Sequence, residues 1–290
     1  MPETSMPGDW PWPSRFHETR DGTLHHVDVG SGPVVVFAHG TPTSSYEWRR
    51  QIAGLSASHR CIALDHLGFG GSARPAQASY TPESHAQRFR SFIDAVIPTE
   101  PVTLVIHDFG GPIALDWALD HPDRLARLVV MNSWMWSFED DPVMWKRGRM
   151  VDGWLGRQLY RHANASLRLI MPSAYGKRSR LDPMVHAYYQ SLFPDPDSRE
   201  LVLYALARSL THSSPYFASL WERRERLCDV PTTIVWGLAD SAFQPPCLER
   251  WRVACPRADV AALEGIGHWP HEEAGDEVTA VLQRILGVSS

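Results

Sequence analysis

Short apolar runs alternate with longer amphipathic segments over much of the chain. Apolar runs rich in β-branched residues, each bounded by turn residues, occupy residues 34–38, 61–64, 102–106, 128–131 and 232–236. Runs of this length and composition predict buried parallel strands. Segments such as 85–96 and 112–119 repeat apolar residues every three or four positions, which predicts helices. The alternation therefore predicts an α/β fold with a mostly parallel, doubly wound sheet.

The alternation stops in the middle of the chain. From residue 134 to about residue 216 the sequence is rich in Trp, Tyr, Arg and Met, shows helical spacing, and contains no clear strand run. A helical block inserted between two strands of one sheet predicts a cap over the carboxyl edge of the sheet, where open α/β folds bind ligands. We therefore expect a core of residues 1–133 and 217–290 and a helical cap of residues 134–216.

Composition narrows the class of partner. Of the 290 residues, 43% are hydrophobic, so the chain can fill a sizeable core. Its formal net charge is −5 and its acidic and basic residues are interspersed, so no basic face predicts binding to nucleic acid or to a membrane surface. The four cysteines are scattered without C-x-x-C spacing, which indicates buried thiols and favours a cytoplasmic location. We expect a small neutral substrate.

A candidate nucleophile lies at the end of the strand predicted for residues 102–106. The sequence His107-Asp108-Phe109-Gly110-Gly111 follows this strand and precedes a helix. This layout is typical of a nucleophile elbow, a sharp turn that lifts one side chain above the sheet while nearby glycines provide room. Asp108 occupies the nucleophile position. The alternative is that Asp108 only caps the following helix, a common place for aspartate.

Two residues further along the chain complete a candidate triad. Asp240 follows the strand predicted for residues 232–236, and His268 lies near the end of the chain after a last short strand. The order nucleophile, acid, histidine is that of α/β-hydrolases. Taken singly, Asp240 is also compatible with a turn and His268 with a surface histidine.

The turn His39-Gly40-Thr41-Pro42 directly follows the strand predicted for residues 34–38. This placement indicates that Thr41 supplies one backbone N–H of an oxyanion hole, and the residue after the nucleophile, Phe109, supplies the other.

These motifs resemble the haloalkane dehalogenase family of α/β-hydrolases. The resemblance rests on residues 39–49 (HGTPTSSYEWR), 65–72 and 107–112, and on the pair Asp240 and His268. It covers both core segments, and the cap only loosely. Epoxide hydrolases, which share the elbow and the H-G-x-P turn, are the nearest relatives. The resemblance implies an ester between Asp108 and the alkyl part of the substrate, which His268, oriented by Asp240, hydrolyses by activating water.

The positions that bind the departing halide differ from the family pattern. In the family, one donor is the indole N–H of a tryptophan directly after the nucleophile, where this chain has Phe109. The second donor is an asparagine after the H-G pair, where this chain has Thr41, or a tryptophan of the cap region. We expect the Thr41 hydroxyl and either Trp134 or Trp136 to bind halide, although both tryptophans are also compatible with a purely apolar role.

Two alternative functions remain open from the sequence. An epoxide hydrolase would protonate the ring oxygen with a pair of cap tyrosines, and a binding protein would keep the fold and pocket without turnover. The tyrosines of the cap region are Tyr160, Tyr175, Tyr188, Tyr189, Tyr204 and Tyr216. The expected partners are a small apolar halogenated or epoxide substrate, water and halide, and we expect neither a metal nor another cofactor. The oligomeric state is not readable from the sequence.

Overall fold

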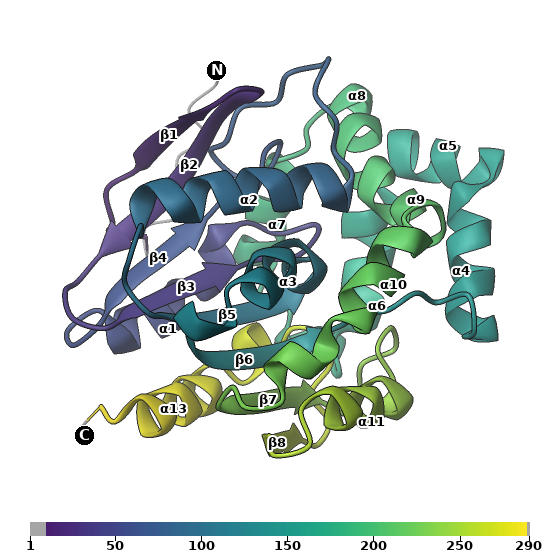
Figure 1. Ribbon diagram of the computed structural model, residues 1–290. Coiled ribbons are helices and arrows are strands. Elements are labelled where there is room, and N and C mark those ends of the chain that lie inside the picture. Colours follow the sequence, from purple (N-terminus) through teal and green to yellow (C-terminus); the bar gives the residue numbers. More distant parts are fainter. Residues whose placement is uncertain (1–9, 289–290) are drawn as a thin grey trace.

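An eight-stranded sheet forms the centre of the protein in a computed structural model that describes residues 10–288 (Figure 1). The strands are β1 (Arg15–Thr19), β2 (Gly22–Val29), β3 (Val34–Ala38), β4 (Arg60–Leu64), β5 (Val102–Asp108), β6 (Leu125–Ser133), β7 (Thr232–Gly237) and β8 (Asp259–Leu263). Their order across the sheet is β1-β2-β4-β3-β5-β6-β7-β8. The six strands from β4 to β8 in this order are parallel, while β2 runs antiparallel to both β1 and β4. The expected α/β class and mostly parallel sheet are confirmed.

The five apolar runs of the sequence all form strands in the middle of this sheet. Strand β3 pairs with β4 on one side and β5 on the other, and all of its residues are buried. The N-terminal hairpin β1–β2 was not predicted. Its first strand is mostly exposed at the edge of the sheet, so it carries no continuous apolar run. Interior strands are buried on both faces and therefore appear in the sequence as continuous apolar runs, whereas an edge strand does not.

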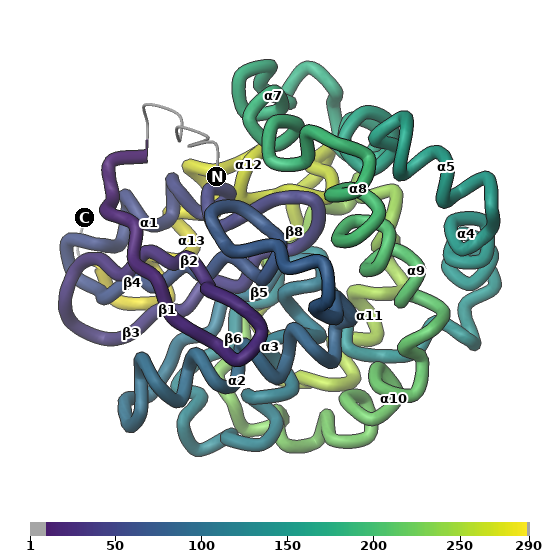
Figure 2. The backbone as a smooth tube through the Cα atoms, turned by 90° about the horizontal axis from the view of Figure 1, so that it is seen from above, coloured from purple at the N-terminus to yellow at the C-terminus, as the bar shows by residue number. Residues whose placement is uncertain are grey.

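Helices cover both faces of the sheet. Figure 2 shows α1 and α13 on one face and α2, α3 and α10 on the other. The core helices are α1 (Arg49–Leu55), α2 (Pro82–Val96), α3 (Gly110–Asp120), α11 (Pro245–Ala254), α12 (Pro270–Glu273) and α13 (Gly275–Leu286), with short 3-10 helices η1 (Ser45–Trp48), η2 (Pro122–Arg124) and η6 (Arg224–Leu227). Both faces of the parallel strands are thereby removed from water.

A helical layer lies to one side of the sheet, between β6 and β7 in the chain (Figures 1 and 2). It comprises α4 (Pro142–Asp152), α5 (Trp154–Ala163), η3 (Ser166–Ile170), α6 (Met171–Ala174), η4 (Arg178–Arg180), α7 (Pro183–Ser191), α8 (Pro196–Ser198), η5 (Arg199–Tyr204), α9 (Ala205–His212) and α10 (Ser214–Glu222). Helix α10 runs across the expected end of the cap at residue 216 and packs on the core helix α3. Within residues 10–288, no helix is both long and apolar enough to cross a membrane.

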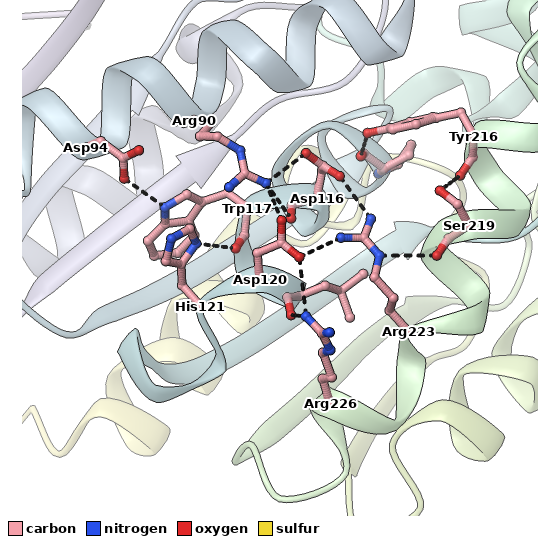
Figure 3. A network of polar contacts seen from close by, with 12 residues as sticks. Arg90, Asp94, Asp116, Trp117, Asp120, His121, Tyr216, Ser219, Arg223 and Arg226 are labelled. Atoms are coloured by element: carbon pink, nitrogen blue, oxygen red, sulfur yellow. Dashed lines mark hydrogen bonds and ion pairs between the residues drawn. The ribbon is translucent and has the colours of Figure 1, made fainter.

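A polar network fastens the end of this layer to the core (Figure 3). Arg223, directly after α10, donates to Asp116 at 2.9 Å and to Asp120 at 2.8 Å, both on α3. Arg90 of α2 donates to the same two carboxylates. The Tyr216 hydroxyl donates to the carbonyl of Pro112 at 2.6 Å, in the first turn of α3. Helix α3, which begins at the candidate elbow, is thus held from two sides.

The four cysteines are free thiols. Cys61, Cys247 and Cys255 are buried and Cys228 is partly buried. Burial raises the pKa of the Cys61 and Cys247 thiols to about 12, so both are protonated at neutral pH.

The turn between β2 and β3 provides a test of backbone packing. Gly30 has φ +80°, and a Cβ there would lie 2.2 Å from the carbonyl oxygen of His59. Gly287 has φ +70°, and no atom of the described residues lies within 4 Å of a Cβ added there. We expect Gly287→Ala to lower the free energy of unfolding by about 1 kcal/mol through backbone strain alone. Gly30→Ala adds a backbone clash and should cost at least about 2 kcal/mol more. Urea unfolding of both variants measures the difference, and equal losses would contradict the packing.

Candidate active site

Asp108 lies on a strained turn between β5 and α3. Its φ is +47°, a left-handed conformation that is rare for residues other than glycine. The turn requires glycine at two neighbouring positions. A Cβ on Gly40 would lie 2.4 Å from the Asp108 Cβ, and a Cβ on Gly110 would lie 2.1 Å from the carbonyl oxygen of Ala38. The Ser133 hydroxyl donates to the Asp108 carbonyl at 2.7 Å. This geometry is that of a nucleophile elbow.

The Asp108 carboxylate does not cap helix α3. The N-cap residue of α3 is Phe109, without a side-chain cap. Instead, Asp108 Oδ1 accepts the backbone N–H of Thr41 at 2.8 Å. The side chain therefore points away from the helix and toward the turn after β3, where it is 6% exposed.

His268 lies between two carboxylates. Its Nε2 is 3.4 Å from Asp108 Oδ2, and its Nδ1 is 2.8 Å from Asp240 Oδ2. All three side chains are buried. The structure thus brings together Asp108, Asp240 and His268 from the ends of β5, β7 and β8, although 160 residues separate the first from the last. A histidine bound to one carboxylate at each ring nitrogen has the arrangement of a catalytic triad.

Asn132 holds the Asp240 carboxylate in place and was not identified from the sequence. Its Nδ2 donates to Asp240 Oδ2 at 2.8 Å, and its Oδ1 accepts the backbone N–H of Gly237 at 2.9 Å. The backbone N–H of Ala242 donates to the other oxygen of Asp240 at 2.6 Å. With these donors in place, Asp240 is fixed as an acceptor for His268. A single polar residue at a strand end gave no signal of this role.

The protonation states follow from burial and the two carboxylates. Burial alone would lower the pKa of the His268 imidazole, but Asp240 and Asp108 together raise it to about 10. Burial would raise the pKa of Asp240, but His268 holds it below its usual value. In the resting protein His268 is therefore an imidazolium and Asp240 a carboxylate at neutral pH.

The structure separates the two candidate halide-binding tryptophans. The Trp134 ring lies edge-on to Phe109, with ring centroids 4.7 Å apart, and 5.0 Å from Phe243, which contacts the His268 ring. The Trp136 ring packs instead against Trp221 at 5.6 Å, Trp251 at 5.8 Å and the Arg250 guanidinium. Trp134 thus belongs to the aromatic wall beside Asp108 and His268, whereas Trp136 packs against residues outside that wall.

Two buried hydrogen-bond donors near Asp108 have no acceptor among the described residues. They are the Trp134 indole nitrogen and the Thr41 hydroxyl. A buried donor without a partner costs free energy unless something else accepts its hydrogen bond. Because Thr41 already binds Asp108 through its backbone N–H, its side chain lies in the same part of the site.

The cap tyrosines are not equivalent. Burial and the nearby Asp108 charge raise the pKa of Tyr160, which places Tyr160 within electrostatic reach of the candidate nucleophile. Its hydroxyl has no hydrogen-bond partner within residues 10–288. Tyr175 stacks on Trp269 at 5.4 Å, and its pKa is raised by burial and then by Glu272 rather than by Asp108.

The remaining tyrosines bind elsewhere. Their hydroxyl contacts are Tyr188 with Ser44, Tyr189 with Glu272, Tyr204 with the Asp152 carbonyl, and Tyr216 with the Pro112 carbonyl. One tyrosine of the cap, rather than a pair, is therefore available beside Asp108.

A surface groove of about 890 Å³ runs between the cap and the loop after β4. Half of its lining residues are charged: Asp152, Arg157, Arg161, Asp197, Glu200 and Arg208. The Tyr204 ring, which also lines the groove, lies 5.9 Å from the Tyr160 ring. None of Asp108, Asp240 and His268 lines the groove.

Three buried residues next to the triad have the donor types of a metal site. Ligand atoms of Glu47, His107 and His271 lie within 4.8 Å of one another, and all three side chains are fully buried. His107 Nε2 donates to the backbone carbonyl of His268 at 2.8 Å. This cluster was not identified from the sequence, although His107 directly precedes the candidate nucleophile.

Comparison with known proteins connects this site to characterised families. Residues 33–275 match the sequence profile of a family described as alpha/beta hydrolase fold. The chain is 29% identical to haloalkane dehalogenase 2 of Mycobacterium tuberculosis, over 98% of each chain. It is also 29% identical to a cis-3-alkyl-4-alkyloxetan-2-one decarboxylase of Shewanella oneidensis, over 95% of this chain and 89% of the relative. An epoxide hydrolase of Caballeronia sordidicola is 30% identical, over 91% and 90%.

Solved structures agree with these relatives. The haloalkane dehalogenase DatA of Agrobacterium tumefaciens superposes with a TM-score of 0.82 at 26% identity, over 95% of this chain and 96% of that one. A variant of DbjA superposes with a TM-score of 0.83 at 25% identity, over 95% and 98%.

The raised pKa of His268 predicts a pH-dependent contribution to stability. Because the folded-state pKa of about 10 lies above the ordinary 6.5, folding favours the protonated imidazole. This contribution is fully present below about pH 6.5 and is lost as the pH rises toward about 10. We therefore expect His268→Gln to destabilise the protein more at about pH 6 than at about pH 10. Urea unfolding of both proteins measures the difference, and an equal loss at the two pH values would contradict the ion pairs.

Proposed function

Because the chain belongs to the α/β-hydrolase fold family, we propose that it is a hydrolase that uses Asp108 to displace halide from a haloalkane. The observation that carries the proposal is the placement of a carboxylate, rather than a hydroxyl, on the elbow and in contact with His268. A carboxylate is ionised at neutral pH and attacks without prior deprotonation. It therefore suits displacement at a saturated carbon bearing a leaving group.

In the first step, Asp108 Oδ2 attacks the carbon that bears the halogen. A carbon–oxygen bond forms and the carbon–halogen bond breaks, with its electron pair leaving on the halide. Oδ1, which accepts the Thr41 N–H, becomes the carbonyl oxygen of the resulting ester. His268 transfers no proton in this step.

In the second step, water attacks the carbonyl carbon of this ester. The negative charge that develops on Oδ1 is stabilised by the N–H of Thr41, and Phe109 provides the second N–H of the oxyanion hole. His268, oriented by Asp240, accepts the proton from water and delivers it to the departing alkoxide, which leaves as an alcohol.

Formation of the ester prepares His268 for this second role. Asp108 is one of the two carboxylates that raise the pKa of His268 to about 10 in the resting protein. Esterification removes the Asp108 charge, so the pKa of His268 falls toward the range of a general base and the imidazolium releases its proton to bulk water. The neutral histidine then serves as the base of the second step, and it takes up a proton from bulk water again once the Asp108 carboxylate is free.

Trp134 and Thr41 are the proposed donors to the departing halide. The Trp134 indole N–H and the Thr41 hydroxyl are buried donors of the site that lack an acceptor among the described residues. A halide leaves without a proton, so its charge needs such donors in a site that excludes water. Trp134 would then take the place of the tryptophan that Phe109 replaces.

Tyr160 supports a second candidate, an epoxide hydrolase. Its hydroxyl stays protonated because its pKa is raised, and it lies near Asp108, so it has the properties of an acid for an epoxide oxygen. The epoxide hydrolase relative from Caballeronia sordidicola agrees with this candidate. We place it second because Tyr160 is the one tyrosine of the cap beside Asp108.

Replacement of His268 should separate the two steps. We expect His268→Phe to form the ester on Asp108 but to hydrolyse it far more slowly, because the base for water is missing. Intact-protein mass spectrometry after incubation with 1,2-dibromoethane should show an adduct that carries the alkyl part of the substrate. The adduct should be absent from the double variant that also carries Asp108→Asn. Absence of the adduct from His268→Phe would contradict covalent catalysis by Asp108.

A small substrate panel on the native protein distinguishes the function classes. The panel consists of 1,2-dibromoethane, 1-iodobutane, styrene oxide and a cis-3,4-dialkyloxetan-2-one, with release of halide, diol or carbon dioxide as the measurement. Halide release without diol supports the proposal. Diol alone supports the epoxide hydrolase, and carbon dioxide alone supports the chemistry named for the Shewanella relative. No product from any of them, together with no adduct, supports a binding protein.

The two tryptophans provide a matched test of halide binding. Loss of a hydrogen bond to a charged group costs enough to slow alkylation by roughly tenfold or more. We expect Trp134→Phe to slow the single-turnover release of halide by this factor and Trp136→Phe to leave it nearly unchanged. Equal effects of the two substitutions would show that Trp134 has no special role.

A further inference from the structure

A buried carboxylate lies directly behind the triad and takes no part in the chemistry described above. Glu47 of η1 is fully buried, and the Thr43 hydroxyl donates to its Oε2. Its Oε1 is 3.3 Å from His107 Nδ1, and its Oε2 is 3.5 Å from His271 Nε2. Burial would raise the pKa of Glu47, but the two imidazoles hold it well below its usual value, so the carboxylate is charged.

The neighbouring charges are already balanced. Glu272 of α12 is paired with the Arg49 guanidinium at 2.6 and 2.7 Å, and it also accepts the Tyr189 hydroxyl. Glu273 is 3.6 Å from the Arg180 guanidinium and also accepts the backbone N–H groups of Gly176 and Gly267. Within the described part of the chain, the groups that face Glu47 are therefore the two histidines and the Thr43 hydroxyl.

The hydrogen bonds of His107 fix where its protons are. Its Nε2 lies 2.8 Å from the backbone carbonyl oxygen of His268. A carbonyl oxygen only accepts, so Nε2 carries a proton. In a neutral ring, Nδ1 would then present a lone pair to the Glu47 carboxylate 3.3 Å away, and two buried acceptors would face each other. A proton or another cation between these two atoms removes this repulsion.

Charge balance selects a proton as this cation. The site holds one carboxylate and two imidazoles, so a divalent metal ion would leave an uncompensated positive charge in a fully buried position. A proton on Nδ1 makes the pair neutral as a whole and requires no further ligand. His271, stacked on Trp48 at 4.5 Å, has its pKa lowered by burial and is the poorer site for the proton.

We propose that Glu47 and a doubly protonated His107 form a buried pair that positions the catalytic histidine. The His107 imidazolium forms an ion pair through Nδ1 with Glu47, 3.3 Å away, and donates through Nε2 to the His268 carbonyl. A charged donor makes the stronger hydrogen bond, so the backbone of His268 is held more firmly than by a neutral ring. This inference rests on the proposed function, in which His268 acts only in hydrolysis of the ester.

The pair should therefore affect one of the two steps. Asp108 is held by the backbone N–H of Thr41 and the hydroxyl of Ser133, and among the described residues neither group contacts Glu47, so we expect alkylation to depend little on the pair. The orientation of the His268 ring toward water does depend on it. Glu47 and His107 are positioning residues, because neither reaches the reacting atoms.

Glu47→Gln tests the pair with little change of shape. We expect this variant to slow hydrolysis of the ester by roughly ten- to a hundredfold while changing the rate of halide release in a single turnover less than about twofold. Asp65→Asn is the matched control, because it neutralises another buried carboxylate, which is bound to His25 at 2.8 Å. Asp65→Asn should lower stability without changing the ratio of the two rates. Equal slowing of both steps by Glu47→Gln would overturn the proposal.

The protonation of His107 can be measured without any substrate. With ¹⁵N-labelled histidine, NMR of the native protein should show a His107 ring with both nitrogens protonated. This state of His107 should disappear in Glu47→Gln and remain in Asp65→Asn. A neutral His107 in the native protein would overturn the proposal. So would one equivalent of bound metal that is lost in Glu47→Gln, because a metal ion would then bridge the cluster. If the spectra agree but no ester forms with any substrate, the proposed function fails and the pair stands.

Discussion

The left-handed turn at Asp108 is the constraint on which the rest of the site depends. A φ of +47° aims the carboxylate away from helix α3 and toward the Thr41 N–H and the His268 ring. An aspartate in this conformation costs free energy, so the surrounding structure has to hold it there. The turn is possible because Gly40 and Gly110 have no Cβ, which at either position would clash with neighbouring atoms. Helix α3, which begins at this turn, is fastened at Pro112 by the Tyr216 hydroxyl and at Asp116 by Arg90 and Arg223 (Figure 3).

The site is also organised by where its positive charges lie. His268 is shared between Asp108 and Asp240, and its proton is most strongly held while both are ionised. In the proposed mechanism the loss of one carboxylate by esterification converts this ion pair into a base. A second charge behind it, on the proposed Glu47 and His107 pair, does not change during the cycle. The His268 imidazole would therefore change its protonation during the reaction, while the His107 imidazole holds His268 in place.

The sequence was sufficient for the fold and for the residues that meet at the carboxyl edge of the sheet. Buried parallel strands give continuous apolar runs, and Asp108, Asp240 and His268 each follow such a run or a short final strand. The edge hairpin β1–β2 gave no such run because it is partly exposed. Asn132 escaped notice because a single polar residue at a strand end is common. Contacts within the cluster of Glu47, His107 and His271 join distant segments, and no local pattern marks them.

The tryptophans show a different limit of sequence reasoning. Trp134 and Trp136 lie two residues apart just after β6, and composition alone does not distinguish them. The path of the chain after β6 distinguishes them. The Trp134 ring packs against Phe109 and Phe243, whereas the Trp136 ring packs against Trp221 and Trp251.

This arrangement also accounts for a phenylalanine beside the nucleophile. The Phe109 side chain has no donor, but its ring packs at a steep angle against that of Trp134, with ring centroids 4.7 Å apart, and the Trp134 indole nitrogen is buried. A donor in a drier position interacts more strongly with a developing anion, because no solvent competes for it. In the proposed function, Phe109 therefore donates no hydrogen bond to the halide. Its contribution is the apolar environment that strengthens the hydrogen bond from the Trp134 indole N–H.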